Sequence, residues 1–151
     1  MADETNRFNR VTAAQLASGV RLGLLHYSNG RWESAMNIFR GLAFIDPQNP
    51  YLHTLLGSAL QQQGRVEEAI AEYTEALKLF PEDVSAMTNR GELHLKAGNI
   101  REAAADLKRA AQLDVTGKHP AANRARLLLN VMESALELVE NEGIDALNNI
   151  K

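Results

Sequence analysis

The sequence predicts an all-α protein, a solenoid of helical hairpins, and the spacing of its small residues carries this prediction. Three sets of small residues each recur at intervals of 34 residues. They are Gly23, Gly57 and Gly91; Gly30, Gly64 and Gly98; and Ala35, Ala69 and Ala103. A fixed period of this length without an insertion indicates stacked helical hairpins, an architecture that presents a surface rather than a deep pocket.

Bulk composition limits the class of protein. The chain of 151 residues carries a net charge of -3, is 45% hydrophobic and 23% charged, and contains no cysteine. These values fit one soluble domain, and the lack of cysteine excludes disulfides, thiolate metal sites and a cysteine nucleophile. Because the net charge is mildly negative, no general attraction to nucleic acid is expected.

The sequence contains no segment that is expected to enter a membrane. The opening stretch, MADETNRFNR, covers residues 1–10, lacks the apolar core of a signal peptide and is expected to be flexible. No apolar run approaches the roughly 18 residues of a membrane span. We therefore expect a cytoplasmic protein without direct membrane insertion.

Hydrophobic periodicity and helix-ending residues place the helices. Asn29-Gly30 ends the first helix, because glycine tolerates a left-handed conformation, and Asp46-Pro47 ends the second. The same unit then repeats twice. The expected helices cover about 11–28 and 31–45, pairs within 50–83 and 84–115, and 120–141, with a final turn or two at 144–150.

Small and large residues alternate in a way that suits packed hairpins. Gly23 and Ala35 have too little bulk to separate two helices, so the helices of one hairpin can approach closely. Large residues at the repeat spacing are expected to fill the space between one hairpin and the next. They are Phe39, Tyr73 and Leu107, together with Trp32, Val66 and Ile100.

The helix expected after Pro120 is amphipathic. Its apolar stripe comprises Leu128, Val131, Ala135 and Leu138, and Glu133, Glu137 and Glu140 line another face. Since the last hairpin of an array would otherwise expose an apolar edge, we expect this helix to cap the stack.

These residues resemble the tetratricopeptide repeat (TPR) family, which places small, large and proline residues at fixed points of each hairpin. The matching residues are the glycines and alanines above, Phe39, Tyr73 and Leu107, then Leu42, Ala76 and Ala110, and Pro47, Pro81 and Val115. The resemblance implies a right-handed TPR solenoid of three helical hairpins plus a C-terminal capping helix. The domain would cover 11–141, with repeats at about 16–49, 50–83 and 84–116, a capping helix at 119–141 and a C-terminal tail at 142–151.

In the TPR family the first helices of the hairpins line a concave groove that holds a partner. The resemblance implies that the groove is formed by Val20, Leu24, Tyr27, Tyr51, Thr54, Leu55, Ser58, Gln62, Asn89 and Glu92. Its N-terminal half is apolar and its C-terminal half polar, which suits an extended peptide with apolar anchors. Alternatively, the N-terminal segment covers Val20 and Leu24.

One specialised function of the family is not expected. Some TPR proteins hold a C-terminal carboxylate with lysines, an arginine and asparagines on their first helices. The matching residues here are Val20, Leu24, Leu55, Ser85 and Asn89. Because they include no cation, docking of heat-shock chaperone tails is not expected.

The histidines and an acidic cluster have structural interpretations. His26, His53 and His94 fall at packing positions of successive first helices, without a second metal ligand one helical turn away. The acidic cluster comprises Glu67, Glu68, Glu72 and Glu75. A convex helix face gives these carboxylates no cleft that would shift a pKa for catalysis. We therefore expect no enzymatic activity, no catalytic residue, no metal and no cofactor.

A basic run at the C-terminal end of the array has two interpretations. The run comprises Lys108, Arg109, Lys118, Arg124 and Arg126. These side chains are either ordinary surface charges near helix ends or a positive edge for an acidic partner. The first interpretation is the simpler one.

Within the TPR family, the size and three-repeat plan resemble the class II (translocator) chaperones of type III secretion systems. The matching residues are Tyr27, Gly30, Arg31, Glu33, Ala35, Phe39, Leu42, Asp46, Leu56, Gly57, Gln62, Gly64, Ala69 and Ile70. The resemblance implies a non-enzymatic protein that holds an extended segment of a secreted translocator.

The alternative is a structural TPR adaptor in a larger bacterial assembly, such as envelope or pilus machinery. In both cases the partner is a protein or peptide. The sequence also leaves open a homodimer, because two short arrays can pair through either end.

Overall fold

The computed structural model describes residues 11–142, which form seven helices and no strand. The helices are α2 (Ala13–Ser28), α3 (Trp32–Ile45), α4 (Pro50–Gln62), α5 (Val66–Leu79), α6 (Val84–Lys96), α7 (Ile100–Leu113) and α8 (Pro120–Glu142). The bounds of α2, α3 and α8 lie within two residues of the expected ones, and the other four helices lie within the pairs expected at 50–83 and 84–115. The expected flexible segment 1–10 and the expected final turn at 144–150 lie outside the described residues. None of the helices within 11–142 is long and apolar enough to cross a membrane.

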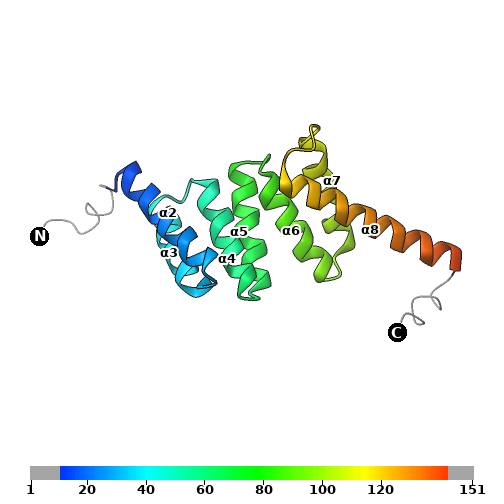
Figure 1. The fold of residues 1–151 in the computed structure, drawn as a ribbon, viewed down its shortest axis with the longest axis horizontal. Coiled ribbons are helices and arrows are strands. Elements are labelled where there is room, and N and C mark those ends of the chain that lie inside the picture. Colours follow the sequence, from blue (N-terminus) through cyan, green and yellow to red (C-terminus); the bar gives the residue numbers. More distant parts are fainter. Residues whose placement is uncertain (1–10, 143–151) are drawn as a thin grey trace, which may run out of the picture.

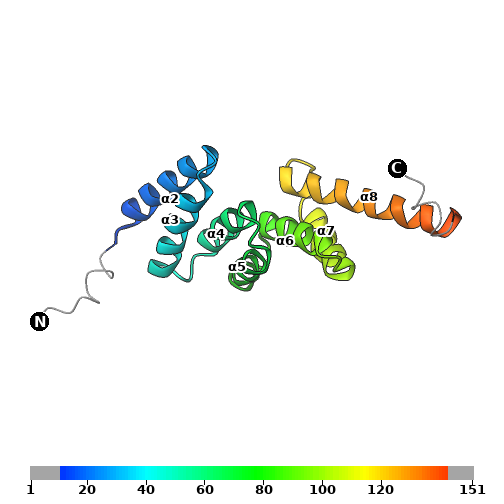
Figure 2. The same cartoon turned by 90° about the horizontal axis from the view of Figure 1, so that it is seen from below.

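Consecutive helices pair into three hairpins that stack in one row. The pairs are α2 with α3, α4 with α5, and α6 with α7, and α8 packs on both helices of the third hairpin. The row is elongated, and it curves so that α2 and α8 rise on the same side at its two ends (Figures 1 and 2). The predicted all-α solenoid of three hairpins with a C-terminal helix is therefore confirmed, while the division into repeats at 16–49, 50–83 and 84–116 stays a prediction.

Each hairpin turns through a glycine in the left-handed region. Gly30, Gly64 and Gly98 have φ of 72°, 72° and 79°. In the first turn the N–H of Gly30 donates to the Tyr27 carbonyl at 3.0 Å, and the N–H of Arg31 donates to the His26 carbonyl at 2.9 Å. These two bonds satisfy carbonyls that the helix end would otherwise leave free. The other two turns repeat the pattern, which explains why this glycine set recurs.

A second glycine set brings the two helices of each hairpin together. A Cβ built on Gly57 would lie 2.8 Å from the ring of Tyr73, and one on Gly23 would lie 2.3 Å from the ring of Phe39. Gly91 faces Leu107 in the same way, at 2.9 Å. The three large side chains are fully buried. They therefore fill the space inside their own hairpins as well as lying in the core of the stack.

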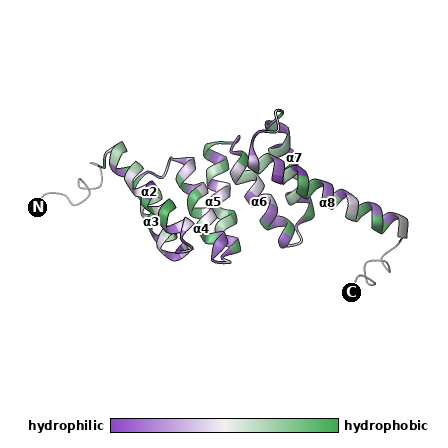
Figure 3. Cartoon of the chain, in the orientation of Figure 1, coloured by the Kyte–Doolittle hydropathy of each residue, from purple (hydrophilic) through white to green (hydrophobic). Residues whose placement is uncertain are grey.

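The apolar core runs continuously through the hairpins. One cluster of buried residues extends from Ala35 in α3 to Leu93 in α6, and a second joins Met87 and Leu107 to Ala125 in α8. Apolar residues accordingly lie along the packed sides of the helices, with polar residues between them (Figure 3). Because the clusters cross hairpin boundaries, the stack is the unit that buries apolar surface.

Polar contacts link each hairpin to the next. The hydroxyl of Thr54 donates to Asp83 Oδ2 at 2.7 Å, and Asp83 also caps α6 by accepting from the Ala86 N–H at 2.9 Å. The hydroxyl of Thr88 lies 3.2 Å from the carbonyl oxygen of Ala121 at the start of α8. Thr54 and Thr88 are separated by one repeat, so the same position couples two successive boundaries.

Two ion pairs join the helices within hairpins. Arg90 on α6 forms a bidentate pair with Asp106 on α7, both bonds being 2.7 Å, and donates to Thr74 on α5 at 3.0 Å. In the preceding hairpin, His53 Nδ1 lies 2.8 Å from Glu72 Oε2. Because Arg90 contacts α5, its ion pair also connects the second hairpin to the third.

The two neighbours of His53 favour its protonated form. Its Nε2 lies 2.9 Å from the carbonyl oxygen of Pro47, and its Nδ1 faces the Glu72 carboxylate. Both partners can only accept, so both contacts are hydrogen bonds only when both ring nitrogens carry a proton. Burial alone would lower the pKa of His53, but these hydrogen bonds and the charges of Glu72 and Glu75 outweigh it and raise the pKa above its ordinary value of 6.5.

The expectation that Trp32 and Ile100 fill the space between hairpins is wrong. Trp32 is 39% exposed and Ile100 is 49% exposed, whereas Val66 packs partly against the core. Each is the first residue of its helix. The adjoining hairpin turns are exposed, so neighbouring helices cover only part of these side chains.

The apolar stripe predicted on α8 is only partly used. The residues of α8 that pack on the array are Ala122, Ala125, Leu128, Leu129 and Met132. Val131 is 59% exposed, Ala135 and Leu138 are exposed, and the second half of α8 extends beyond the array (Figure 1). Only the first half of α8 therefore covers the third hairpin. The expectation that the whole stripe packs on the stack is wrong, because most of it faces solvent.

The glycine contact predicts opposite effects for two glycine-to-alanine changes. Gly57→Ala should lower the free energy of unfolding by about 1–3 kcal/mol, because the added methyl group displaces the buried Tyr73 ring. Gly41→Ala, also within a helix but with open space around it, should raise it by up to about 1 kcal/mol. Urea unfolding of the two variants measures both. Equal effects of the same sign would contradict the close contact.

Burial predicts that Trp32 contributes less to stability than Phe39. Phe39→Ala should lower the free energy of unfolding by about 3–5 kcal/mol, because the ring is fully buried. Trp32→Ala should lower it by less than about 2 kcal/mol, because the indole is partly exposed. Chemical unfolding followed by circular dichroism measures the two losses. A loss at Trp32 as large as that at Phe39 would show that the indole is buried.

The His53 contacts predict a pH-dependent contribution to stability. Because the folded-state pKa is raised, the stabilisation is present below the unfolded pKa of about 6.5 and is lost as the pH rises through the folded pKa. The stability difference between wild type and His53→Gln should therefore be larger at about pH 5.5 than at about pH 8.5. Thermal unfolding across this range measures it, and Glu72→Gln should reduce the dependence. A difference that grows with pH would contradict the assignment.

Candidate functional site

The concave side of the row carries two adjoining hollows. The residues that line them belong to α2, α4, α6, the start of α8 and the short connections that precede α4 and α8. No residue of α5 or α7 lines either of these hollows. Figure 2 shows why: α2 and α8 rise at the two ends of the curved row, while α5 lies on its outer side.

The first hollow lies between α2 and α4 and is largely apolar. Its volume is about 520 Å³. Its lining residues are Ala13, Leu16, Ala17, Val20, Arg21, Asp46, Asn49, Tyr51 and Leu52. Most of these side chains are aliphatic or aromatic; the charged and amide groups are Arg21 on α2 and Asp46 and Asn49 in the α3–α4 connection. This hollow can accept an apolar side chain.

The second hollow lies between α4, α6 and the start of α8 and is more polar. Its volume is about 450 Å³. Its lining residues are Tyr51, Thr54, Leu55, Ser58, Ser85, Asn89, His119, Pro120, Ala121 and Arg124. Hydroxyl, amide, imidazole and guanidinium groups therefore surround Leu55, so this hollow offers hydrogen bonds to a bound chain.

Tyr51 lines both hollows and makes them one continuous surface. Its side chain is 51% exposed at the start of α4. We call the combined surface the groove, defined by the lining residues of the two hollows. An aromatic side chain with a polar tip at the junction can pack against an apolar group on one side and donate a hydrogen bond on the other.

Some polar groups near the groove are already used by the fold. The buried Tyr73 hydroxyl donates to Gln61 Oε1 at 2.8 Å and lies 3.2 Å from Ser58 Oγ, and burial is the main reason that its pKa is raised. Thr54 is buried with its hydroxyl on Asp83. These groups shape the floor of the groove rather than remain free for a ligand.

The structure places six of the ten predicted groove residues along the two hollows. They are Val20, Tyr51, Thr54, Leu55, Ser58 and Asn89. The other four line neither hollow, although they lie on the same first helices. Leu24 and Gln62 are exposed, Tyr27 packs partly against the core, and Glu92 is half-buried beside Arg124.

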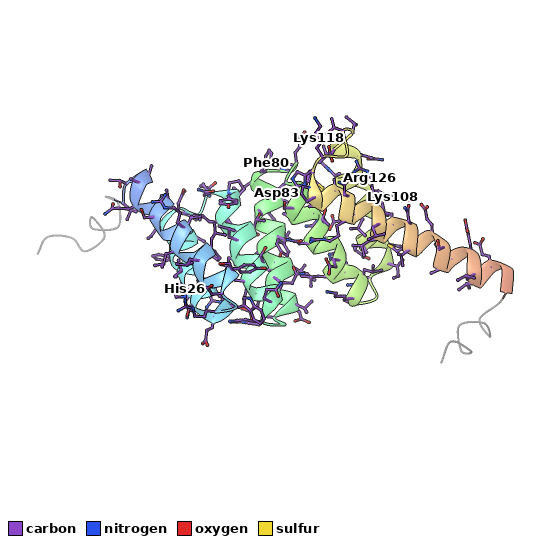
Figure 4. All side chains as sticks on the ribbon, in the orientation of Figure 1. His26, Phe80, Asp83, Lys108, Lys118 and Arg126 are labelled. Carbon is purple, nitrogen blue, oxygen red and sulfur yellow. The ribbon has the colours of Figure 1, made fainter. Side chains whose placement is uncertain are left out.

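Sequence reasoning missed the wall that α8 contributes. His119, Pro120, Ala121 and Arg124 line the polar hollow, although α8 was expected only to cap the stack. Their position depends on the connection between α7 and α8, which contains Lys118, and on Arg126 of α8 (Figure 4). The irregular sequence after the third repeat was the available signal that α8 does not continue the array in register.

Asp114 organises that connection. Its carboxylate accepts from the backbone N–H of His119 at 2.8 Å and from the hydroxyl of Thr116 at 2.8 Å. Arg126 of α8 donates to the carbonyl oxygens of Ala111, at 2.8 Å, and of Asp114. The hydrogen bond from the His119 N–H is the main cause that lowers the pKa of Asp114 to about 2, so the carboxylate stays ionised at neutral pH.

Arg124 extends from α8 to α6 across the polar hollow. Its guanidinium donates to Asn89 Oδ1, and its Nε lies 3.6 Å from Glu92 Oε2. The other oxygen of Glu92 lies 2.9 Å from Lys96 Nζ. The basic run therefore separates on folding: Arg126 stabilises the α7–α8 connection, while Arg124 faces the groove.

Another hollow lies among α5, α6 and α7 and has a structural explanation. Its volume is about 270 Å³, and its lining includes the Arg90–Asp106 ion pair with Thr74. These groups already satisfy one another. Among the described residues, histidine and carboxylate side chains do not gather in groups of three or more that could hold a metal ion.

Sequence comparison finds similar segments in larger proteins. The chain is 32% identical to a peroxisomal targeting signal receptor of Candida glabrata over 119 residues, which cover 76% of this chain and 20% of that protein. It is 37% identical to the human protein O-mannosyl-transferase TMTC1 over 91 residues, which cover 56% of this chain and 10% of that protein. The chain thus spans a fifth or less of the length of these curated relatives.

Structural comparison finds the same fold in bacterial secretion chaperones. The type III secretion translocator chaperone SycD of Yersinia enterocolitica matches with a TM-score of 0.79 and 21% identity, over 85% of this chain and 90% of that chain. PcrH, solved in complex with the chaperone binding region of PopD, matches with a TM-score of 0.76 and 23% identity, over 83% and 96%. At these identities the likeness establishes the fold.

The family follows from the sequence and the fold together. The tetratricopeptide repeat family model matches residues 54–114 and 89–133, which together cover more than half of the chain. The structure supplies the feature that defines such repeats, stacked hairpins with a period of 34 residues. The chain therefore belongs to the tetratricopeptide repeat family.

Proposed function

We propose that this protein is a non-enzymatic binding module that holds an extended segment of a partner protein in its groove. The observation that carries this proposal is the continuity of an apolar and a polar hollow through the exposed ring of Tyr51. An extended segment needs pockets for alternate side chains and hydrogen-bonding groups for its backbone, and the two hollows offer both. The proposed contact residues within the two hollows are Val20, Tyr51, Thr54, Leu55, Ser58 and Asn89. Leu24, Tyr27, Gln62 and Glu92, which lie outside the hollows on the same first helices, are proposed to extend the contact.

We further propose that the partner is a translocator of a type III secretion system and that the protein works in the cytoplasm. The support is the fold shared with SycD and PcrH and the presence of the PopD chaperone binding region in the PcrH complex. A chaperone of this kind would hold a secreted protein with long apolar segments before export and then release it.

The alternative is a structural adaptor in a larger bacterial assembly. The exposed apolar residues of α8 support it, because Leu127 is 62% exposed and Val131 is 59% exposed on a helix that extends beyond the array. A permanent partner, or a second copy in a homodimer, would cover such residues. The homodimer stays a prediction.

The absence of enzymatic activity is also part of the proposal. The chain corresponds to 10% of the length of the mannosyl-transferase named above, so that protein's activity does not transfer by similarity. The buried Thr54 hydroxyl of the groove and the Tyr73 hydroxyl beside it are engaged in bonds that hold the helices together.

A charge in the groove should abolish capture of the partner. Leu55→Glu puts a carboxylate among the side chains that line the polar hollow, where a bound segment would have to bury it, so a partner that wild type captures from native extract should be lost. Phe44→Glu is the matched control, because Phe44 is 79% exposed on α3 and lines neither hollow. Quantitative mass spectrometry of the captured proteins gives the comparison, with helicity checked by circular dichroism.

The identity of the lost proteins separates the alternatives. Loss of one secreted protein with long apolar segments would support the chaperone function. Retention of several mutually associated proteins by wild type and both variants would instead support an adaptor that binds outside the groove. A partner that Leu55→Glu retains at wild-type level would contradict the groove as its binding site.

A further inference from the structure

The polar hollow carries a positive charge that is only partly compensated. Arg124 is the one fully charged residue among the described residues that line it, and none of them is a carboxylate. Behind the lining lies the carboxylate of Asp83, whose two oxygens accept from the Thr54 hydroxyl and the Ala86 N–H. Asp83 therefore serves the hairpin boundary and the cap of α6.

Glu92 neutralises Arg124 only in part. Glu92 lies between two cations, 2.9 Å from Lys96 Nζ and 3.6 Å from Arg124 Nε. Two positive groups share one negative group, so the cluster keeps a net positive charge. The side chain of Arg124 is also 47% exposed, which leaves guanidinium N–H groups free to donate.

We propose that Arg124 selects partners that carry an Asp or Glu side chain beside the apolar anchor. This inference rests on the proposed function, because it assigns the chemistry of the segment that the groove holds. A guanidinium forms two parallel, charge-assisted hydrogen bonds with a carboxylate, which gives both affinity and direction. Tyr51 joins the two hollows, so a segment anchored in the apolar hollow continues past Arg124, where an internal side chain can reach it.

The geometry of the array sets the spacing of the motif. Neighbouring packed helices lie roughly 8–10 Å apart, and an extended chain advances about 3.3 Å per residue. The apolar hollow lies between α2 and α4, and the polar hollow begins at α4 and reaches α6 and α8. Because Arg124 stands on α8, at least one such helix spacing beyond α4, the acidic residue should stand at one fixed spacing of at least about three residues from the apolar anchor.

Selection from a random peptide library tests the proposal. Random peptides of roughly 12 residues, about 40 Å long when extended, are displayed between flanking sequences so that they have no free terminus. They are selected on wild type, Arg124→Gln, Arg124→Glu and Arg101→Gln. Arg101 is the matched control, an exposed arginine on α7 that lines neither hollow.

Wild type and Arg101→Gln should enrich an apolar residue with Asp or Glu at one fixed spacing. Arg124→Gln should enrich the apolar residue alone, and Arg124→Glu should enrich Lys or Arg at the acidic position. Two results would overturn the role of Arg124 and leave the groove function standing. Wild type could enrich apolar peptides without an acidic preference, or the acidic preference could persist with Arg124→Gln. If every peptide selected on wild type also bound Leu55→Glu, or if wild type selected none, the result would instead count against the groove function itself.

A change on the peptide side avoids any effect on folding. Replacing the enriched Glu by Gln in a synthetic peptide should weaken binding to wild type by roughly tenfold and leave binding to Arg124→Gln unchanged. Equal weakening for both proteins would overturn the proposed pair. A second library with free C-termini distinguishes the source of the carboxylate, and enrichment of peptides that end at the acidic position would overturn the assignment to a side chain.

Discussion

The contact between a glycine of each first helix and a large side chain of each second helix is the constraint on which the rest of the structure depends. It brings Gly23 against Phe39 and Gly57 against Tyr73, closer than any side chain at the glycine would permit. Because the same contact recurs in each hairpin, the hairpins have one shape and stack in one row. The curved row in turn places the first helices side by side, and this arrangement creates the groove.

The polar links between hairpins are not the same at each boundary, and this difference gives the groove an apolar end and a polar end. Thr54 and Thr88 occupy equivalent positions and face the start of the next first helix. The equivalent residue of the first hairpin is Val20, which makes no such bond and lines the apolar hollow. The apolar end of the groove therefore lies where this polar coupling is absent, and the polar end lies where α4 and α6 already carry hydroxyl and amide groups.

Repetition made the fold predictable, and the loss of repetition limited the prediction of the site. The period of 34 residues identified the helices, the turns at Gly30 and its equivalents, and the buried Phe39, because each signal occurs three times. It failed at Trp32, since repeat position alone does not tell how much of a helix-end side chain its neighbours cover. The period could not place Arg124 of the basic run beside the groove, because α8 lies outside the three repeats and its placement depends on the bonds of Asp114.

The position of α8 gives one helix two roles that cannot be varied independently. Ala122 and Ala125 are buried against the third hairpin, while Arg124, between them in sequence, faces the groove. Any rotation of α8 that moved Arg124 away from Asn89 would also expose the two alanines. The loss of their burial would cost free energy and so opposes such a rotation. The packing of the cap therefore fixes the backbone that carries Arg124, and the contacts with Asn89 and Glu92 direct its guanidinium toward α6.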